Sequence, residues 1–165
     1  MFEVVLDNSL KEKAKAKAEE MGVLNNSILQ GNGSIAGFLG EQIALLCLGG
    51  IWENTYEYDI IIPDGRKVDV KTKQTSVTPR LEYDCSVANL NTRQKCDAYA
   101  FTRVRADFAV GWYLGLINKD VFFNRARFLR KGDIDHSNNY SVRTDCYNLT
   151  IKELIEMEGN FYDNS

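Results

Sequence analysis

The sequence predicts a mixed α/β domain in which helices cover both faces of one sheet. Segments with helical and strand-like patterning follow one another in the order helix, helix, strands, helix, strand, helix, as in layered α/β folds. The chain of 165 residues is 44% hydrophobic and 26% charged, which are ordinary values for one globular core. We therefore expect a single domain that spans residues 1–165.

A β-hairpin is the most informative local prediction. Residues 56–62 are rich in aromatic and β-branched side chains, and residues 67–72 alternate polar and apolar side chains. Between them lies Pro63-Asp64-Gly65, in which proline favours the first turn position and glycine the positive φ of a bulge. This composition favours a three-residue hairpin loop closed by a glycine bulge.

The length of this loop fixes which side chains face each other. A three-residue loop gives the following opposed pairs: Ile62 and Arg66, Asp59 and Asp69, Glu57 and Lys71. Like charges directly opposite destabilise a hairpin, so facing aspartates indicate a cation between them. A two-residue turn would instead pair Asp59 with Val70 and put the aspartates on opposite faces. A further alternative is a hairpin whose solvated polar face carries Asp69, Lys71 and Lys73.

A helix is predicted from Ser34 to Leu48, with its first residue as N-cap and Gly49-Gly50 at its end. Glu41 lies on this helix among small or apolar neighbours that include Gly37 and Ala44. The small residues would allow another backbone to approach closely, so we expect Glu41 to be partly buried. A buried carboxylate needs a partner. The alternative is a boundary glutamate paired with a lysine.

The remaining elements are predicted from caps, alternation and turn residues. Ser9 and Glu12 form a capping box that opens a first helix, which ends near Met21. A second capping box, Thr150 and Glu153, opens the last helix. Between them we expect strands at 81–88, 97–104 and 108–117, a helix at 119–129 capped by Asn118, and a short strand near Cys146.

Three carboxylates and a lysine occur in a fixed order: Glu41 on a helix, Asp59 on the first hairpin strand, and Asp69-Val70-Lys71 on the second. This order resembles that of the PD-(D/E)xK nuclease superfamily, whose restriction-endonuclease-like fold is a mixed β-sheet flanked by helices. The resemblance covers roughly residues 34 to 117. It implies the same α/β fold for this chain.

Two short stretches carry the resemblance. Gly37–Glu41 is similar to the helix motif of the superfamily, and Val68–Thr72 is similar to its signature strand. A literal Pro63-Asp64 also occurs, but it lies at the hairpin tip, five residues before Asp69. We interpret Pro63-Asp64 as turn residues and Asp59 as the counterpart of the first aspartate of the superfamily.

The resemblance implies a Mg²⁺-dependent nuclease that hydrolyses DNA phosphodiester bonds, with Mn²⁺ able to replace Mg²⁺. Asp59, Asp69 and the Val70 carbonyl would be oxygen ligands of the metal, and Glu41 would complete the site directly or through water. Lys71 would stabilise the attacking water and the charge that develops on the phosphate. Small phage and prokaryotic enzymes are the expected relatives, and the choice between endonuclease and exonuclease stays open.

Two alternatives share this fold. One is an endonuclease that resembles Holliday-junction resolvases, which would act as a homodimer because symmetric cutting of two strands needs two sites. The other is a nucleic-acid-binding module without catalysis. A structural protein whose carboxylates are paired surface groups is a third possibility.

The distribution of charge supports a nucleic-acid partner although the net charge is −3. Residues 66–131 hold 14 basic and 6 acidic side chains. Lys73, Arg125 and Arg127 belong to this basic third and are candidates for contacts with DNA phosphates. The alternative is that these charges point in several directions and form no single surface.

The composition also argues against several other classes of protein. No apolar run approaches the ~20 residues that span a bilayer, and the N-terminus lacks the basic start of a signal peptide. We expect a cytoplasmic protein, in the host cytoplasm if it is viral, with no membrane partner. The four cysteines form no Cys-x-x-Cys pair and there is one histidine, which argues against a zinc site.

Overall fold

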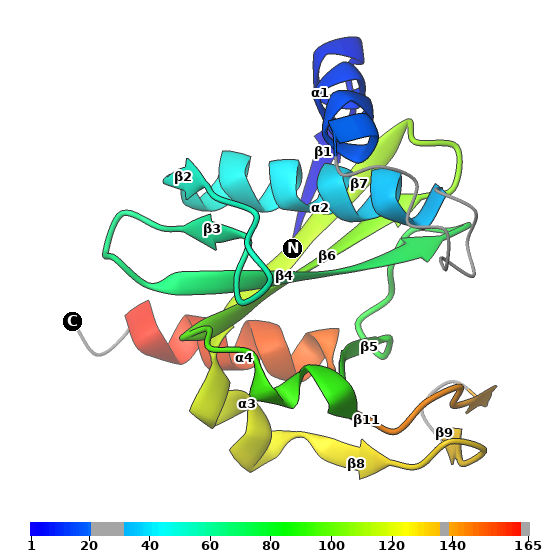
Figure 1. Ribbon diagram of the computed structural model, residues 1–165. Coiled ribbons are helices and arrows are strands. Elements are labelled where there is room, and N and C mark those ends of the chain that lie inside the picture. The colour runs from blue at the N-terminus through cyan, green and yellow to red at the C-terminus, as the bar shows by residue number, and fades with distance from the viewer. Residues whose placement is uncertain (21–31, 136–138, 163–165) are drawn as a thin grey trace.

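The computed structural model describes residues 1–20, 32–135 and 139–162 (Figure 1). Within these ranges the fold is mixed α/β, as the sequence predicts, with a six-stranded sheet, two smaller sheets and four α-helices. The strands of the large sheet lie in the order β1 (Phe2–Val5), β7 (Val110–Asn118), β6 (Ala98–Arg105), β4 (Lys67–Thr75), β3 (Ile60–Ile61), β2 (Ile51–Trp52). Only β4 and β6 run parallel; the other neighbours are antiparallel.

Helices cover the two faces of the large sheet (Figure 1). On one face α2 (Asn32–Leu48) lies across β4, β6 and β7, and α1 (Asn8–Glu20) packs against α2. On the other face lie α3 (Lys119–Arg125) and α4 (Ile151–Tyr162). Because successive strand residues point to opposite faces, the central strands β6 and β7 each contribute to two separate hydrophobic cores.

A three-stranded sheet lies beside α3 and α4 in the order β5 (Asp84–Ala88), β11 (Cys146–Thr150), β8 (Arg127–Leu129). A 3-10 helix, η1 (Asn89–Arg93), follows β5. A two-stranded ribbon joins β9 (Ile134–Asp135) to β10 (Tyr140–Ser141). β4 and β5 make direct contacts, so the small sheet lies close to the polar face of β4.

Glycine at position 40 sets the distance between α2 and the sheet. A Cβ at Gly40 would overlap the side chains of Thr72 on β4 and Thr102 on β6. These two threonine hydroxyls lie 2.9 Å apart and share a hydrogen bond beneath the helix. The close approach expected at Gly37 occurs instead one turn later, because nothing lies within 4 Å of a Cβ built on Gly37.

Several predicted elements are confirmed with small shifts of their ends. The last helix begins after the predicted capping box, in which Thr150 Oγ1 accepts from Glu153 N at 3.2 Å and Glu153 Oε2 accepts from Thr150 N at 2.7 Å. Strands predicted at 97–104 and 108–117 correspond to β6 and β7, and the strand near Cys146 corresponds to β11. The strand predicted at 81–88 starts only at Asp84.

Both predicted N-caps near the N-terminus are wrong. The first helix is capped by Asp7, whose Oδ1 accepts from Leu10 N at 2.9 Å, and Ser9 lies inside the helix. The second helix begins at Asn32, so Ser34 is not its cap. The expected end near Met21 lies outside the described residues.

Two predicted elements are too long. The helix expected at 119–129 ends at Arg125 because Ala126 is extended, with ψ 141°, and residues 127–129 pair with β11. The strand expected at 56–62 is reduced to β3, because turns occupy the residues before Asp59. In both segments local propensity is overridden by hydrogen bonds that the sequence pattern does not reveal.

Within the described residues, no helix is both long and apolar enough to cross a membrane.

We expect Gly40→Ala to lower the free energy of unfolding by about 1–3 kcal/mol, because the added methyl group forces α2 away from the two threonines. Gly37→Ala is the matched control on the same helix: with open space around it, it should be neutral or stabilise by up to about 1 kcal/mol. Urea unfolding of both variants measures the difference. Equal effects of the two substitutions would contradict the close contact at Gly40.

Candidate active site

The hairpin loop is the predicted three-residue loop. Gly65 has a φ of 88° and donates its N–H to Ile62 O at 2.9 Å, while Ile62 N donates to Arg66 O at 3.1 Å. The strand register, with Ile60 opposite Val68, follows from this loop and is the predicted one. Asp64 stabilises the turn, since its Oδ1 accepts a hydrogen bond from Arg66 N at 3.0 Å.

Asp59 lies just beyond the β3–β4 ladder and not in a regular cross-strand pair. Its N–H donates to Val68 O at 2.9 Å, and its Oδ2 accepts from Val70 N at 2.6 Å. The carboxylate therefore occupies the place beside β4 where β3 no longer provides hydrogen bonds. The sequence predicts that Asp59 and Asp69 meet, and in the structure the Asp59 carboxyl group, held by the N–H of the residue after Asp69, contacts the Asp69 carboxyl group.

The predicted pairing of Glu57 with Lys71 is wrong. Glu57 Oε2 accepts from Lys95 N at 2.6 Å, so this side chain faces a different part of the chain. The reason is a turn around Thr55, whose hydroxyl accepts from the N–H groups of Glu57 and Tyr58. Such a turn competes with an extended strand.

Glu41 reaches the same region from α2. Its side chain is buried, with 7% exposure, and its Oε2 accepts from Trp52 Nε1 at 2.5 Å. Trp52 is on β2 and packs edge-on against Phe38 of the helix. The hydrogen-bond partner of the buried Glu41 carboxylate is thus the Trp52 indole N–H, and not a lysine as in the alternative prediction of a boundary glutamate.

Asp69 and Lys71 lie on one face of β4, as strand alternation predicts. Asp69 is 4% exposed, and its Oδ2 lies 2.5 Å from Lys71 Nζ. Lys71 Nζ also donates to Gln94 Oε1 at 3.1 Å. The ammonium group is therefore held between a buried carboxylate and a neutral amide.

The three carboxylates are close enough to shift each other's ionisation. Burial, together with the charges of Glu41 and Asp69, raises the pKa of Asp59 to about 8, although the hydrogen bond from Val70 N–H acts to lower it. Burial likewise raises the pKa of Glu41 to about 7, against the hydrogen bond from Trp52, with the charge of Asp69 adding to the rise. Three separate parts of the chain thus converge on one crowded acidic site.

The donor chemistry of this site fits a divalent cation. Carboxylate oxygens are the ligands that Mg²⁺ prefers, and a cation would relieve the repulsion that raises these pKa values. Asp69 Oδ2 is buried without a well-formed hydrogen bond, although Lys71 lies beside it. Among the described residues, no group of three His, Cys, Asp or Glu side chains is arranged as a ready-made metal site. The carboxylates are turned toward Trp52, Val70 N–H and Lys71.

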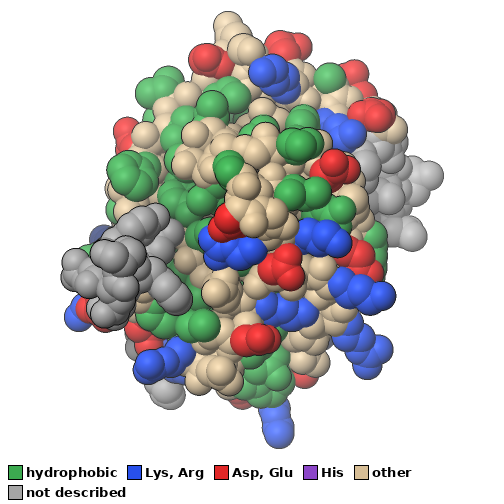
Figure 2. All heavy atoms as spheres, turned by 90° about the vertical axis from the view of Figure 1, so that its left-hand side faces the viewer, with side chains coloured by type: hydrophobic (Ala, Val, Ile, Leu, Met, Phe, Trp, Pro, Cys, Tyr) green, Lys and Arg blue, Asp and Glu red, His purple; other side chains and the backbone are tan. Residues whose placement is uncertain are grey.

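The three basic residues predicted to contact DNA lie in different settings. Lys73 Nζ donates to Ser86 Oγ at 2.6 Å and to Asp84 O at 3.2 Å, inside the protein. Arg127 pairs with Asp84 at 2.9 Å, and Arg125 is exposed at the end of α3. Figure 2 shows basic side chains interleaved with acidic ones on the face that carries the hairpin.

Trp52 and Gln94 are site residues that the sequence analysis missed. Both contact the site from irregular or very short segments, where no periodicity marks them. The one signal that could have identified Trp52 is the capacity of an indole N–H to satisfy a buried carboxylate.

No model of a known protein family matches the chain, and no curated protein is similar to it.

We expect Asp59→Asn to stabilise the metal-free protein at alkaline pH. The pKa of Asp59 in the folded state, about 8, is above its ordinary value of 3.8, so folding favours the protonated form. The contribution of protonated Asp59 to the free energy of unfolding is fully present below about pH 4 and is lost as the pH rises through about 8. In EDTA, the Tm of the variant should exceed that of the parent by about 5 °C near pH 9 and by much less near pH 5.

Asp64→Asn is the matched control, because the pKa of Asp64 is shifted in the opposite direction: hydrogen bonds from Arg66 lower it. It should not stabilise the protein as the pH rises. A Tm difference for Asp59→Asn that is the same at both pH values would show that the carboxylates are not crowded.

Proposed function

We propose that this protein is a Mg²⁺-dependent nuclease that hydrolyses DNA phosphodiester bonds, in the manner of the PD-(D/E)xK superfamily. One observation carries the proposal: Glu41, Asp59, Asp69 and Lys71 come from a helix, a loop and a strand and meet at one site. Their order along the chain is the one that the resemblance requires. The mixed sheet, with α2 packed on β4 beside the β3–β4 hairpin, agrees with a restriction-endonuclease-like fold.

The proposed reaction is hydrolysis at phosphorus. Water forms a bond to phosphorus and one P–O ester bond breaks, which leaves a phosphate on one strand end and a hydroxyl on the other. The proton lost by water balances the alkoxide that leaves. No oxidant or further co-reactant is needed.

Asp59, Asp69, the Val70 carbonyl and Glu41 would hold the Mg²⁺ ion, either directly or through water. Such an ion would neutralise charge on the phosphate and favour ionisation of the attacking water. The protein fixes two of these carboxylates before any ion binds, because Val70 N–H holds Asp59 and the Trp52 indole holds Glu41. Preorganised groups lose little freedom when substrate arrives.

Lys71 supplies positive charge where negative charge develops in the transition state. Its ammonium is held by Asp69 and Gln94, and the Tyr99 ring lies beneath it at 6.0 Å. Since Lys71 lies two residues from Asp69 on the same face of β4, both groups would lie on one side of a bound phosphate. The aspartate would bind the cation while the lysine contacts the attacking water or the phosphate.

We expect metal-dependent cutting of DNA that requires Lys71. Supercoiled plasmid, linear duplex and single-stranded DNA are incubated with Mg²⁺, Mn²⁺ or EDTA. Lys71→Ala should reduce the cutting rate by roughly 100-fold or more, because its charge stabilises the transition state. Lys152→Ala, which removes an exposed lysine of α4, should cut at the parent rate. Equal activity in the Lys71→Ala protein would refute the assigned role.

A measurement of Mg²⁺ binding distinguishes a metal-dependent enzyme from a non-catalytic binding module with the same fold. Saturating Mg²⁺ should raise the Tm of the parent protein, by an amount equivalent to roughly 2.7 kcal/mol at 100 times the Kd. Asp69→Asn should lose most of this rise, whereas Lys71→Ala should keep it. A protein that shows neither the rise nor any cutting would support a binding role without catalysis.

A further inference from the structure

Lys71 shares its charged partner with the cation of the proposed reaction. In the structure the Lys71 ammonium lies 2.5 Å from Asp69 Oδ2. In the function that we propose, Asp69 becomes a metal ligand, so its negative charge is shared with the cation, and the cation and the ammonium repel each other. Because a lysine side chain is long and flexible, a second contact is then needed to keep the ammonium in place.

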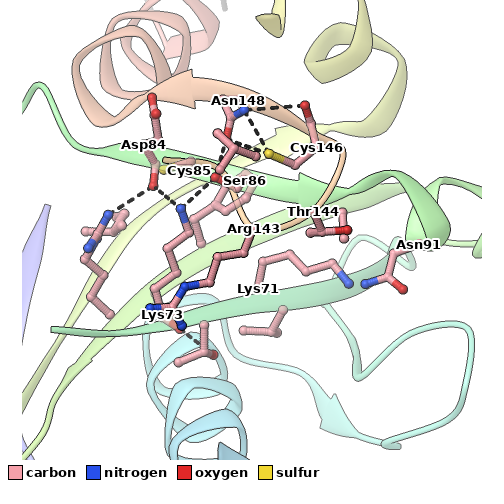
Figure 3. A pocket seen from close by; sticks show the side chains of 18 of the residues that line it. Lys71, Lys73, Asp84, Cys85, Ser86, Asn91, Arg143, Thr144, Cys146 and Asn148 are labelled. Carbon is pink, nitrogen blue, oxygen red and sulfur yellow. Dashed lines mark hydrogen bonds between the residues drawn. The ribbon is translucent and has the colours of Figure 1, made fainter. Parts of the chain in front are cut away.

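Lys71 also has open space on one side. A cavity of about 480 Å³ is bounded by β4, β5 and β11, and Lys71 is part of its lining. Figure 3 shows the Lys71 side chain at the edge of this cavity, with its ammonium end directed toward Asn91 of η1. Without a restraint, the ammonium could therefore move away from the carboxylates and into the cavity.

Gln94, which directly follows η1, contacts the Lys71 ammonium from outside the carboxylate cluster. Its Oε1 accepts from Lys71 Nζ at 3.1 Å, and its Nε2 donates to Tyr56 O at 3.0 Å. These two partners fix the orientation of the amide, because a flipped amide would place its NH₂ group against the ammonium and its oxygen against a carbonyl. A neutral acceptor also leaves the positive charge of Lys71 available to the phosphate.

The main chain around Gln94 is itself fixed. Gln94 O accepts from Nζ of Lys119, the first residue of α3, at 2.5 Å. Further along the chain, Asp97 N donates to Lys67 O and Lys67 N donates to Asp97 Oδ2, both at 2.8 Å. Since β4 carries Lys67 as well as Lys71, the segment that presents the Gln94 amide is attached to the same strand as the ammonium that this amide contacts.

We propose that Gln94 is a positioning residue, which keeps the Lys71 ammonium beside the attacking water and the phosphate once Asp69 binds the cation. The proposal rests on the nuclease function for the reaction, whereas the contact between Gln94 and Lys71 is present without a metal. Gln94 acts through Lys71. Its loss should therefore release Lys71 when Asp69 no longer holds the ammonium, and it should slow cutting only in a protein that has Lys71.

Nuclear magnetic resonance of the lysine Cε–Hε groups measures this contact without metal or DNA. An immobilised lysine gives separate signals for its two Hε protons, and a mobile one gives a single averaged signal. In Asp69→Asn the Lys71 signals should stay separate, because Gln94 still holds the ammonium. Adding Gln94→Leu should merge them. Adding Gln74→Leu instead, which removes an exposed glutamine of β4, should keep them separate.

Cutting rates measure the consequence for catalysis. Gln94→Leu should lower kcat about tenfold or more and change the KM for DNA by less than about threefold, because it misplaces a group that acts in the transition state. In a Lys71→Ala protein, Gln94→Leu should cause no further loss, since residues that act as a unit are not additive. Gln74→Leu should cut at the parent rate.

Three results would overturn the proposal: separate Lys71 signals in Asp69→Asn with Gln94→Leu, a parent kcat in Gln94→Leu, or a further loss from Gln94→Leu when Lys71 is already alanine. Gln94→Glu controls for a disturbed loop, because it keeps an oxygen acceptor for Lys71. With Asp69→Asn it should keep the signals separate, and merged signals there would also contradict the proposal. A parent protein with the expected signals that cuts no DNA would refute the nuclease alone.

Discussion

The candidate site depends on how closely α2 lies on the large sheet. Gly40 allows the helix to rest on the hydroxyls of Thr72 and Thr102, and the next residue is Glu41. Since Thr72 belongs to the same strand as Asp69, this one contact sets the distance between the helix carboxylate and the strand carboxylate. A larger residue would separate the two groups without changing any acidic residue, so the chemistry of the site is sensitive to a position that has no polar side chain.

The acidic site is arranged at the expense of stability. Burial and mutual repulsion raise the pKa values of Asp59 and Glu41, which means that the folded protein disfavours their charged forms. Lys71 brings a positive charge into direct contact with Asp69 of the cluster. A fold under selection for stability alone would replace such carboxylates. Their presence in a buried setting is therefore better explained by a ligand that supplies positive charge than by packing.

The sequence predicts those parts of the site that depend on local rules, and it misses those that depend on distant contacts. Gly65 and Pro63 determine the loop and hence the register of the hairpin, and alternation places Asp69 and Lys71 on one face. The cap of α1 and the end of α3 were misplaced because a competing side chain or strand pairing outweighs the local pattern. Trp52, and the depth at which Lys73 is buried, follow only from how distant segments pack.

β4 connects the carboxylate site with the small sheet. Asp69, Lys71 and Lys73 alternate on one face of this strand, about 6.6–6.8 Å apart from each to the next. Asp69 lies in the carboxylate cluster, Lys71 contacts Asp69, and Lys73 donates hydrogen bonds to Ser86 and to the Asp84 carbonyl of the small sheet. In the function that we propose, Asp69 holds the cation and Lys71 stabilises the transition state, so these two groups follow one another along a single strand. Because β4 is held between β3 and β6, Asp69, Lys71 and Lys73 keep a fixed spacing, so the sheet itself sets the distance between the carboxylate cluster and the two lysines.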